Sequence, residues 1–271
     1  MPTYLADIVA AHRRAAAADD RDPDALLAGA LATSVPPPFA AALAGGPLSV
    51  VAEVKRRSPS KGPLAPGLDP AAIAAAYAAG GASCLSVLTD RDHFGGSPAD
   101  LVAARQASGL PALRKDFTVS VADVCDARAM GASAVLLIVA ALDDGELRRF
   151  LDAAATLDLD ALVEVHDEAE LDRALAAGAR LVGVNQRDLA TFEVDPERAE
   201  RLATGIPEHV VAVAESGIAD GQDAARLAAA GFQAVLVGEA LVSAPDPAAA
   251  VAAMTGHPVS PRRAGSRSPL R

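Results

Sequence analysis

Four stretches of the chain repeat one pattern, in which an alanine-containing segment ends at a glycine and a run of apolar residues follows. They are AAGGASCLSVL (78–88), AMGASAVLLIV (129–139), AAGARLVGV (176–184) and AAGFQAVLVG (229–238). Alanine favours helices and β-branched residues favour strands, so each stretch predicts the end of a helix and the start of a strand. A glycine just past a helix suits the left-handed C-cap position. We expect that conformation at Gly80, Gly131, Gly178 and Gly231.

The distance between these glycines predicts a larger repeat. Successive glycines lie 47–53 residues apart, which is room for two strand–helix units. The additional strands are expected at 48–54, 110–117, 158–166 and 209–216. Eight such units over about 200 residues predict a (β/α)8 barrel, the TIM barrel. A doubly wound open sheet is the alternative, but no glycine-rich dinucleotide loop follows the first strand.

Three regions are expected along the chain. They are a helical N-terminal extension, a catalytic barrel domain and a disordered tail, at residues 1–45, 46–255 and 256–271. The extension should begin with an amphipathic helix, since Leu5, Ile8 and Val9 share one helix face, and it meets a helix breaker in VPPP (35–38). The tail has four arginines, no acidic residue and no apolar periodicity, which is typical of a disordered segment.

Composition and charge exclude several classes of protein. With 51% hydrophobic and 22% charged residues, the chain suits a folded globular domain. It has no apolar run of the ~18 residues that a membrane span needs, and its N-terminus lacks the pattern of a secretory signal. A net charge of −11 argues against a nucleic-acid surface but allows a small anionic ligand. Cys84 and Cys125 lie in apolar segments, which predicts reduced thiols and a cytoplasmic protein. Together with the apolar runs and the net charge, this predicts a protein without membrane or nucleic-acid partners.

Polar side chains gather where the predicted strands end. They are Glu53 and Lys55, Lys115 and Asp116, Glu164, Asn185 and Arg187, and Glu215 and Ser216. A single charge at a strand end can simply mark where the chain meets solvent, and we keep that interpretation for Asp116, His166 and Glu215. It explains poorly why two glutamates, two lysines, an asparagine and an arginine share one rim. Carboxylates and ammoniums that lie close together shift each other's pKa, so the rim predicts acid–base catalysis at the carboxyl end of a barrel.

Weaker signals concern phosphate, metals and aromatic groups. Gly217 and Gly238 follow strands 7 and 8, where barrels often bind phosphate, and Ser58 and Ser216 could add hydroxyl donors. Phe94 and Phe117 could line an aromatic pocket. The five histidines show no metal-ligand spacing, so no metal site is expected; they are His12, His93, His166, His209 and His257.

Several long motifs occur together and in order along the chain. They are AEVKRRSPSKG (52–62), LRKDF (113–117), AVLLIVAAL (134–142), ALVEVHDEAEL (161–171), VGVNQRDLATFEVD (182–195), AESGI (214–218) and LVGEAL (236–241). In these motifs, from about residue 3 to about residue 254, the chain resembles indole-3-glycerol phosphate synthase. Two positions differ from the usual family pattern, which has an asparagine at Gln186 and often an aromatic residue at His93.

The resemblance implies a substrate and a reaction. The substrate would be 1-(2-carboxyphenylamino)-1-deoxyribulose 5-phosphate, which closes to an indole with loss of carbon dioxide and water in tryptophan biosynthesis. The implied enzyme is a carboxy-lyase that needs no cofactor and no metal. Its partner would be a small phosphosugar, and the chain would act as a monomer or a weak homodimer.

The resemblance also implies roles for individual residues. Lys115 matches the general acid of ring closure, and Glu164 matches the acid/base of dehydration. Glu53 and Lys55 match a pair in which the lysine would steer the substrate carboxylate, while the glutamate would hold the lysine network and help with proton transfer. Asn185 and Arg187 match residues that position the substrate and Glu164, and Ser216 matches a serine of the catalytic site. The remaining matches are Ser58, Gly217, Gly238 and the backbone near Glu239 for phosphate, and Phe94, Phe117, Leu136 and Leu189 for the walls around the aromatic ring.

Two other functions remain open from the residues alone. A sugar-phosphate aldolase would use Lys115 as a Schiff-base nucleophile, and borohydride would trap its substrate on that lysine. A non-catalytic barrel would bind the phosphosugar without forming an indole. The rim of two glutamates and two lysines favours the ring-closing enzyme over both.

Overall fold

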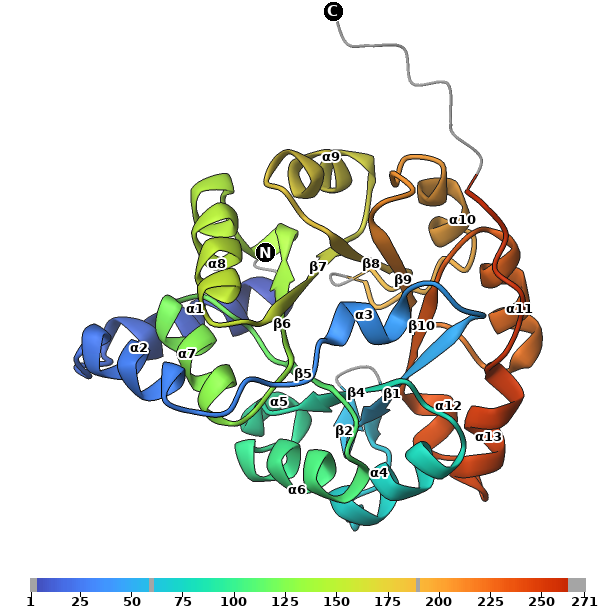
Figure 1. The fold of residues 1–271 in the computed structure, drawn as a ribbon, viewed down its shortest axis with the longest axis horizontal. Helices are drawn as coiled ribbons and strands as arrows, with labels where there is room; N and C mark the ends of the chain where they lie inside the picture. Colours follow the sequence, from blue (N-terminus) through green and yellow to red (C-terminus); the bar gives the residue numbers. More distant parts are fainter. Residues whose placement is uncertain (1–3, 59–60, 189–190, 263–271) are drawn as a thin grey trace, which may run out of the picture.

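The barrel is closed. The computed structural model describes residues 4–58, 61–188 and 191–262. Within these residues, eight parallel strands pair in the order β1-β10-β9-β8-β7-β6-β5-β4, and β4 returns to β1 (Figure 1). The strands are β1 (Ser49–Val54), β4 (Cys84–Leu88), β5 (Ala112–Lys115), β6 (Ala134–Ile138), β7 (Asp160–Val165), β8 (Leu181–Asn185), β9 (Val211–Glu215) and β10 (Ala234–Val237). The predicted (β/α)8 fold is confirmed, and closure excludes the open sheet.

Helices surround the barrel and connect its strands. They are α4 (Pro70–Ala79), α5 (Arg91–Phe94), α6 (Pro98–Ser108), α7 (Val121–Ala129), the short 3-10 helix η1 (Val139–Ala141), α8 (Asp144–Thr156), α9 (Glu168–Ala176), α10 (Arg198–Ala203), α11 (Gly221–Ala229), α12 (Glu239–Val242) and α13 (Pro247–Met254). Aspartate or serine caps most of the longer ones; Ser120 and Asp143 form complete capping boxes. Across the residues that the structure describes, no helix combines the length and apolarity needed to cross a membrane.

The glycines that follow helices differ from the prediction at one position. Gly131, Gly178 and Gly231 have positive φ angles, as expected for the left-handed position. After α4, however, the left-handed residue is Gly81, with φ of 90°, whereas Gly80 has a φ of −76°. Gly80 is needed for a different reason, since a Cβ there would collide with the backbone of Ala248. Gly80 therefore allows close packing against Ala248, whereas Gly81 adopts the left-handed conformation that ends the helix.

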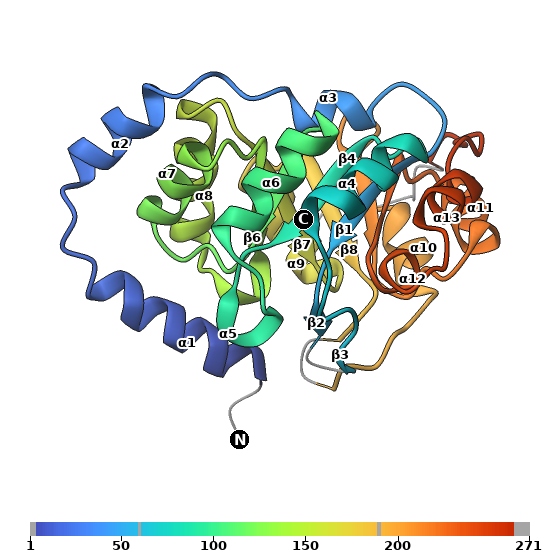
Figure 2. The same ribbon diagram turned by 90° about the horizontal axis from the view of Figure 1, so that it is seen from below.

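The N-terminal extension reaches both ends of the barrel. It consists of α1 (Tyr4–Ala17), α2 (Pro23–Leu31) and α3 (Phe39–Leu43), and α3 begins just after the predicted breaker at 35–38. Figure 2 shows α1 at the same end as the small hairpin of β2 (Arg57–Ser58) and β3 (Gly62–Pro63), with α3 at the opposite end. The hairpin follows β1, so α1 lies near the carboxyl ends of the strands.

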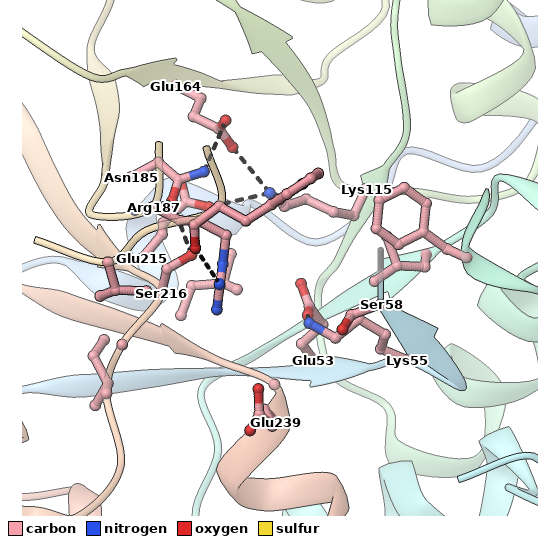
Figure 3. Close-up of a pocket in the computed structure, with 18 of the residues that line it drawn as sticks. Glu53, Lys55, Ser58, Lys115, Glu164, Asn185, Arg187, Glu215, Ser216 and Glu239 are labelled. Carbon is pink, nitrogen blue, oxygen red and sulfur yellow. Dashed lines mark hydrogen bonds and ion pairs between the residues drawn. The ribbon is translucent and has the colours of Figure 1, made fainter. Parts of the chain in front are cut away.

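The inside of the barrel has an apolar base and an ionisable top. The base includes Val51, Leu113, Leu162 and Val213, and Phe39 and Leu43 of α3 pack against it. Side chains alternate across a strand, so the residues two positions further along face inward as well. Those residues are Glu53, Lys115, Glu164 and Glu215 (Figure 3). The structure therefore brings these charged side chains together at one rim of the barrel, as predicted.

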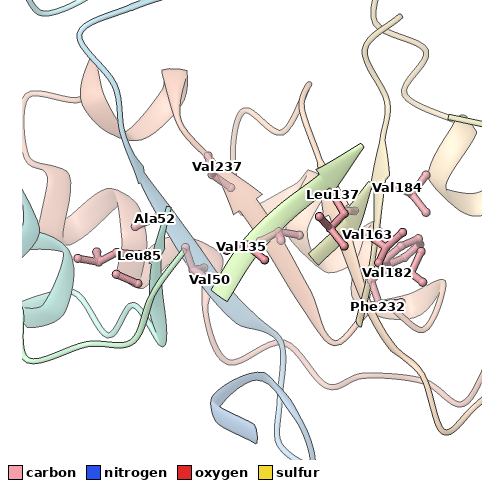
Figure 4. Packing of buried hydrophobic residues seen from close by; sticks show 14 of the residues in the cluster. Val50, Ala52, Leu85, Val135, Leu137, Val163, Val182, Val184, Phe232 and Val237 are labelled. Carbon is pink, nitrogen blue, oxygen red and sulfur yellow. The ribbon is translucent and has the colours of Figure 1, made fainter. Parts of the chain in front are cut away.

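The other face of each strand packs outward against the helices. Val50 and Ala52 of β1, Leu85 of β4, and Val135 and Leu137 of β6 belong to this layer (Figure 4). All five side chains are fully or almost fully buried. Burial of this kind contributes about 25 cal/mol per Å² of apolar surface, so the layer between strands and helices is the main source of stability. The stability of the fold therefore arises mainly away from the charged rim.

The start of the predicted disordered tail is ordered. The Leu48 N–H donates to the carbonyl of His257, and the Ser260 N–H donates to that of Ala228. Arg262 is 7% exposed, and its guanidinium donates to backbone carbonyls that include those of Val210 and Gly231, at 2.6 and 2.9 Å. The prediction for 256–271 thus differs from the structure over 256–262, because arginine composition does not reveal carbonyl acceptors supplied by distant loops. Residues 263–271 lie outside the described residues.

Arg262→Ala is expected to lower the free energy of unfolding by about 2–4 kcal/mol, because it leaves several buried carbonyls without a donor. Urea denaturation followed by circular dichroism measures the change. Arg201→Ala is the control, since Arg201 is an exposed partner of Asp195, and its midpoint should hardly move. Equal midpoints for both variants would contradict a structural role for Arg262.

Candidate active site

Lys115 lies at the centre of the rim. The side chain leaves the end of β5, and its Nζ donates to Glu164 Oε2 at 3.0 Å and to Glu215 Oε2 at 3.1 Å (Figure 3). The two glutamates come from β7 and β9, and both are 1% exposed. One ammonium therefore bridges two buried carboxylates on different strands.

The two carboxylates respond oppositely to this arrangement. Burial raises the pKa of Glu164, but the charge of Lys115 and the nearby His166 and Asn185 outweigh it, so the pKa falls below its usual value. Burial and the charge of Glu164 raise the pKa of Glu215 to about 7. Glu215 Oε1 has no hydrogen-bond partner among the described residues, which is consistent with the weaker stabilisation of its anion. For Lys115, burial lowers the pKa, but Glu164 and Glu215 raise it above its usual range.

A glycine on the neighbouring strand makes room for Glu215. Gly183 faces inward from β8, and a Cβ at this position would collide with the carboxylate of Glu215. Leu162 would also lie only 3.2 Å from such a Cβ. Glycine at position 183 therefore allows the Glu215 side chain to reach Lys115.

Asn185 orients Glu164. Its Nδ2 donates to Glu164 Oε1 at 3.1 Å, while its Oδ1 accepts from Ser216 Oγ at 2.8 Å and from the Arg187 N–H at 3.0 Å. The amide is therefore held at both ends. Ser216 has a φ of 67°, an unusual conformation for a residue other than glycine. That conformation places its hydroxyl in the network.

Glu53 and Lys55 form a second ion pair on the same rim. Their Oε1 and Nζ atoms are 2.5 Å apart, and Ser86 Oγ donates to the other oxygen of Glu53 at 3.4 Å. A Cβ at Gly238 would collide with Glu53 and would lie 3.1 Å from Lys55 Nζ. A charged group without a partner is costly to bury, and the ion pair between Glu53 and Lys55 offsets this cost at the end of the buried strand β1.

A cavity of about 750 Å³ connects these groups. The predicted site residues that line it are Glu53, Lys55, Ser58, Phe94, Lys115, Phe117, Leu136, Glu164, Asn185, Arg187, Ser216, Gly217, Gly238 and Glu239. Leu189 lies outside the described residues. Apolar side chains, charged side chains, and serine or glycine positions all contribute to this lining.

Several lining residues were not predicted. Glu215 was interpreted as a solvent-facing charge, although the alternation with Val213 already pointed it inward. Tyr4, Leu5 and Ile8 of α1 line the cavity, yet the amphipathic pattern of this helix did not indicate which surface it covers. Lys61 reaches across the mouth to pair with Glu239, a contact for which the sequence offered no signal.

Possible metal ligands of the described residues come together elsewhere. His12, Asp90 and His93 present ligand atoms that all lie within 4.8 Å of one another. They belong to α1 and to the turn that begins α5, beside the mouth rather than within it. The expectation of no metal site rested on spacing along the chain and did not anticipate this cluster.

Glu215→Gln should alter how stability depends on pH. A carboxyl group with a pKa near 7 in the folded chain and near 4.5 in the unfolded chain binds more protons when folded. The stabilisation that protonated Glu215 contributes to the free energy of unfolding is fully present below pH 4.5. It is lost as the pH rises through 7, and the total loss is about 3 kcal/mol. The variant should therefore gain stability relative to the parent between pH 4.5 and pH 8, as measured by urea denaturation.

Glu164→Gln is the matched control for this pH series. The pKa of Glu164 is lowered on folding, so its contribution is present above the unfolded value and is lost as the pH falls. The stability of this variant relative to the parent should change in the opposite direction. If the stability of both variants relative to the parent changed with pH in the same direction, the pKa values of the two carboxylates would not be shifted oppositely, and the prediction would be wrong.

The closed barrel, with its ionisable residues gathered at the carboxyl ends of the strands, defines a (β/α)8-barrel enzyme. The chain belongs to the indole-3-glycerol phosphate synthase family, whose model matches residues 5–254. It is 59% identical over 208 residues to the indole-3-glycerol phosphate synthase of a Nocardioides species, covering 77% of this chain and 80% of the relative. The enzyme of that name from Mycobacterium ulcerans is 51% identical over 240 residues, covering 87% and 88%.

Solved structures add support for the fold. Thiamine phosphate pyrophosphorylase from Pyrococcus furiosus superimposes with a TM-score of 0.58 at 18% identity, covering 76% of this chain and 93% of that protein. At this identity the similarity concerns the barrel architecture alone.

Proposed function

We propose that the chain converts 1-(2-carboxyphenylamino)-1-deoxyribulose 5-phosphate to indole-3-glycerol phosphate, with loss of carbon dioxide and water. The observation that carries the proposal is the position of Lys115, at hydrogen-bond distance from two buried carboxylates whose pKa values are shifted in opposite directions. A proton donor and a proton acceptor are thus available together near neutral pH. Membership of the family supplies the substrate class.

The lining of the cavity fits the two ends of this substrate. Phe94, Phe117 and Leu136 offer an apolar wall for the aromatic ring. Ser58 and the backbone around Gly217, Gly238 and Glu239 are proposed to hold the phosphate. Lys55 and Arg187 bring positive charge toward the substrate carboxylate and phosphate. The negative charge of the whole chain is therefore no obstacle to an anionic substrate.

Ring closure is assigned to Lys115. The aromatic carbon that bears the carboxylate forms a bond to the ketone carbon, while Nζ of Lys115 donates a proton to the ketone oxygen. The carbon–carboxylate bond then breaks, carbon dioxide leaves, and its bonding electrons restore the aromatic ring. The oxygen that accepted the proton becomes a hydroxyl group, which the next step removes.

Dehydration is assigned to Glu164. The hydroxyl leaves as water together with a hydrogen from the neighbouring carbon that carries the nitrogen, and a double bond forms between the two carbons. Glu164 is suited to this proton transfer because Asn185 and Lys115 hold both of its oxygens. Asn185, Ser216 and Arg187 act as positioning residues.

The aldolase alternative is disfavoured by the surroundings of Lys115. A Schiff-base lysine must lose its proton, which a lowered pKa favours. The two neighbouring carboxylates instead raise the pKa of Lys115 and keep it protonated. Borohydride should therefore fail to trap a sugar phosphate on this residue.

Purified protein and the carboxyphenylamino sugar phosphate test the proposed function. Indole fluorescence should rise with turnover, and one carbon dioxide should be released per indole. Binding without fluorescence would identify the non-catalytic barrel instead, and borohydride trapping on Lys115 would identify the aldolase. The monomeric or weakly dimeric state and the cytoplasmic location stay predictions of the sequence.

A further inference from the structure

Two imidazoles and one carboxylate meet at the side of the barrel mouth. His12 Nε2, from the middle of α1, lies 3.0 Å from Asp90 Oδ2. His93 Nδ1, from α5, lies 3.1 Å from the same oxygen. Asp90 is 6% exposed, and the two histidines are half-buried. The helix and the turn come from parts of the sequence 78 residues apart.

Asp90 is held so that one oxygen faces both imidazoles. As the N-cap of α5, its Oδ1 accepts from the backbone N–H groups of His93 and Phe94, at 2.6 and 3.3 Å. Capping fixes the carboxylate and occupies Oδ1. His93 Nδ1 also lies 3.2 Å from Oδ1, but Oδ2 is the oxygen that lies within hydrogen-bond distance of both ring nitrogens.

We propose that His12 Nε2, His93 Nδ1 and Asp90 Oδ2 bind a zinc ion. Two imidazoles and a carboxylate are ligands that zinc accepts, with a fourth position left for water. Ligands 2.0–2.1 Å from a tetrahedral zinc lie about 3.3 Å from one another. The separations of 3.0 and 3.1 Å from Oδ2 are close to this value, and the two ring nitrogens lie within 4.8 Å of each other. To bind zinc, each imidazole must be neutral and present its lone pair at His12 Nε2 or His93 Nδ1, with its hydrogen on the other ring nitrogen.

The neighbouring charge also favours a cation. Asp116 Oδ1 lies 4.0 Å from His12 Nε2, and the side chain of Asp116 is 5% exposed. Arg114 and Thr89 already bind its other oxygen. Asp116 is thus a carboxylate beside the site that is not a ligand, and Arg114 offsets part of its charge.

Zinc at this position would fasten α1 to α5. The first turns of α1 line the cavity through Tyr4, Leu5 and Ile8, and further along the helix Arg13 pairs with Glu146. An ion held by His12 and His93 adds a second attachment of α1 to the barrel. We therefore expect zinc to protect the α1–α2 connection from limited proteolysis.

Zinc titration of untagged, EDTA-treated protein, in competition with a chromophoric chelator, tests the site. The parent should bind one zinc per chain. His12→Gln and His93→Phe should each weaken binding at least about tenfold, since each removes a ligand. His209→Gln is the matched control, because His209 is exposed and outside the cluster, and it should bind like the parent.

A second measurement covers variants that fold poorly. Phenylalanine at position 93 keeps an aromatic ring against Tyr4, whose ring centre is 6.0 Å from that of His93. Zinc should raise the Tm of the parent and of His209→Gln by mass action, and should raise that of His93→Phe by clearly less at the same zinc concentration. Equal zinc affinity in the parent and His93→Phe would overturn the proposal, as would a parent that binds no zinc. No substrate enters these measurements, so their outcome is independent of the proposed enzymatic activity.

Discussion

Lys115→Ala is expected to lower kcat by about 10²–10⁴-fold, with a barrel that still folds. The ammonium is the proton donor proposed for the ketone oxygen, and no water molecule would be held in its place with the same orientation. Folding should survive because Glu164 and Glu215 can take up protons once the ammonium is gone. Indole fluorescence measures turnover, and circular dichroism with a thermal scan measures folding.

Arg21→Ala is the control for loss of a cation. Arg21 pairs with Asp19 and Asp126 on the surface, away from the cavity, so its turnover should match that of the parent. Turnover close to the parental value in folded Lys115→Ala would refute the assignment of this lysine as the general acid.

Glu164→Gln is expected to separate the two halves of the reaction. The amide preserves the shape of the side chain and can still accept from Asn185, but it cannot exchange a proton at neutral pH. Indole formation should fall by at least about 10²-fold, whereas carbon dioxide should still be released in a single turnover. Trapping of carbon dioxide and indole fluorescence, recorded on the same sample, measure the two steps.

Glu200→Gln serves as the control, since Glu200 is an exposed partner of Arg226. Equal loss of carbon dioxide release and of indole formation in Glu164→Gln would show that Glu164 already acts during ring closure. Unchanged rates of both would remove it from the mechanism altogether.

The difference between Glu164 and Glu215 has a simple physical origin. Both are buried and both contact Lys115, but Asn185 also donates to Glu164, while one oxygen of Glu215 has no partner among the described residues. One ammonium cannot fully stabilise two buried carboxylates. The pKa of Glu215 therefore lies near 7, so this carboxyl group can donate or accept a proton near neutral pH.

The barrel and its rim could be predicted because their signals are local. Side chains of a strand alternate in direction, and glycines follow helices, so short stretches such as 134–138 and 181–185 reveal where strands run. Glu53, Lys115, Glu164 and Asn185 lie at or near the ends of such strands, and a closed barrel of parallel strands brings all of these ends to one side.

Other features depend on contacts between residues far apart in the chain. The pattern of α1 shows an apolar face, but only the folded chain lays that face over the cavity and brings His12 to Asp90. The sequence around Arg262 is typical of a disordered segment, but in the folded chain distant loops supply the carbonyls that its guanidinium binds. The pKa of Glu215 is likewise set by Lys115, Glu164 and burial. Alternation and capping act over a few residues, whereas burial, ion pairing and ligand clusters arise when distant segments pack together.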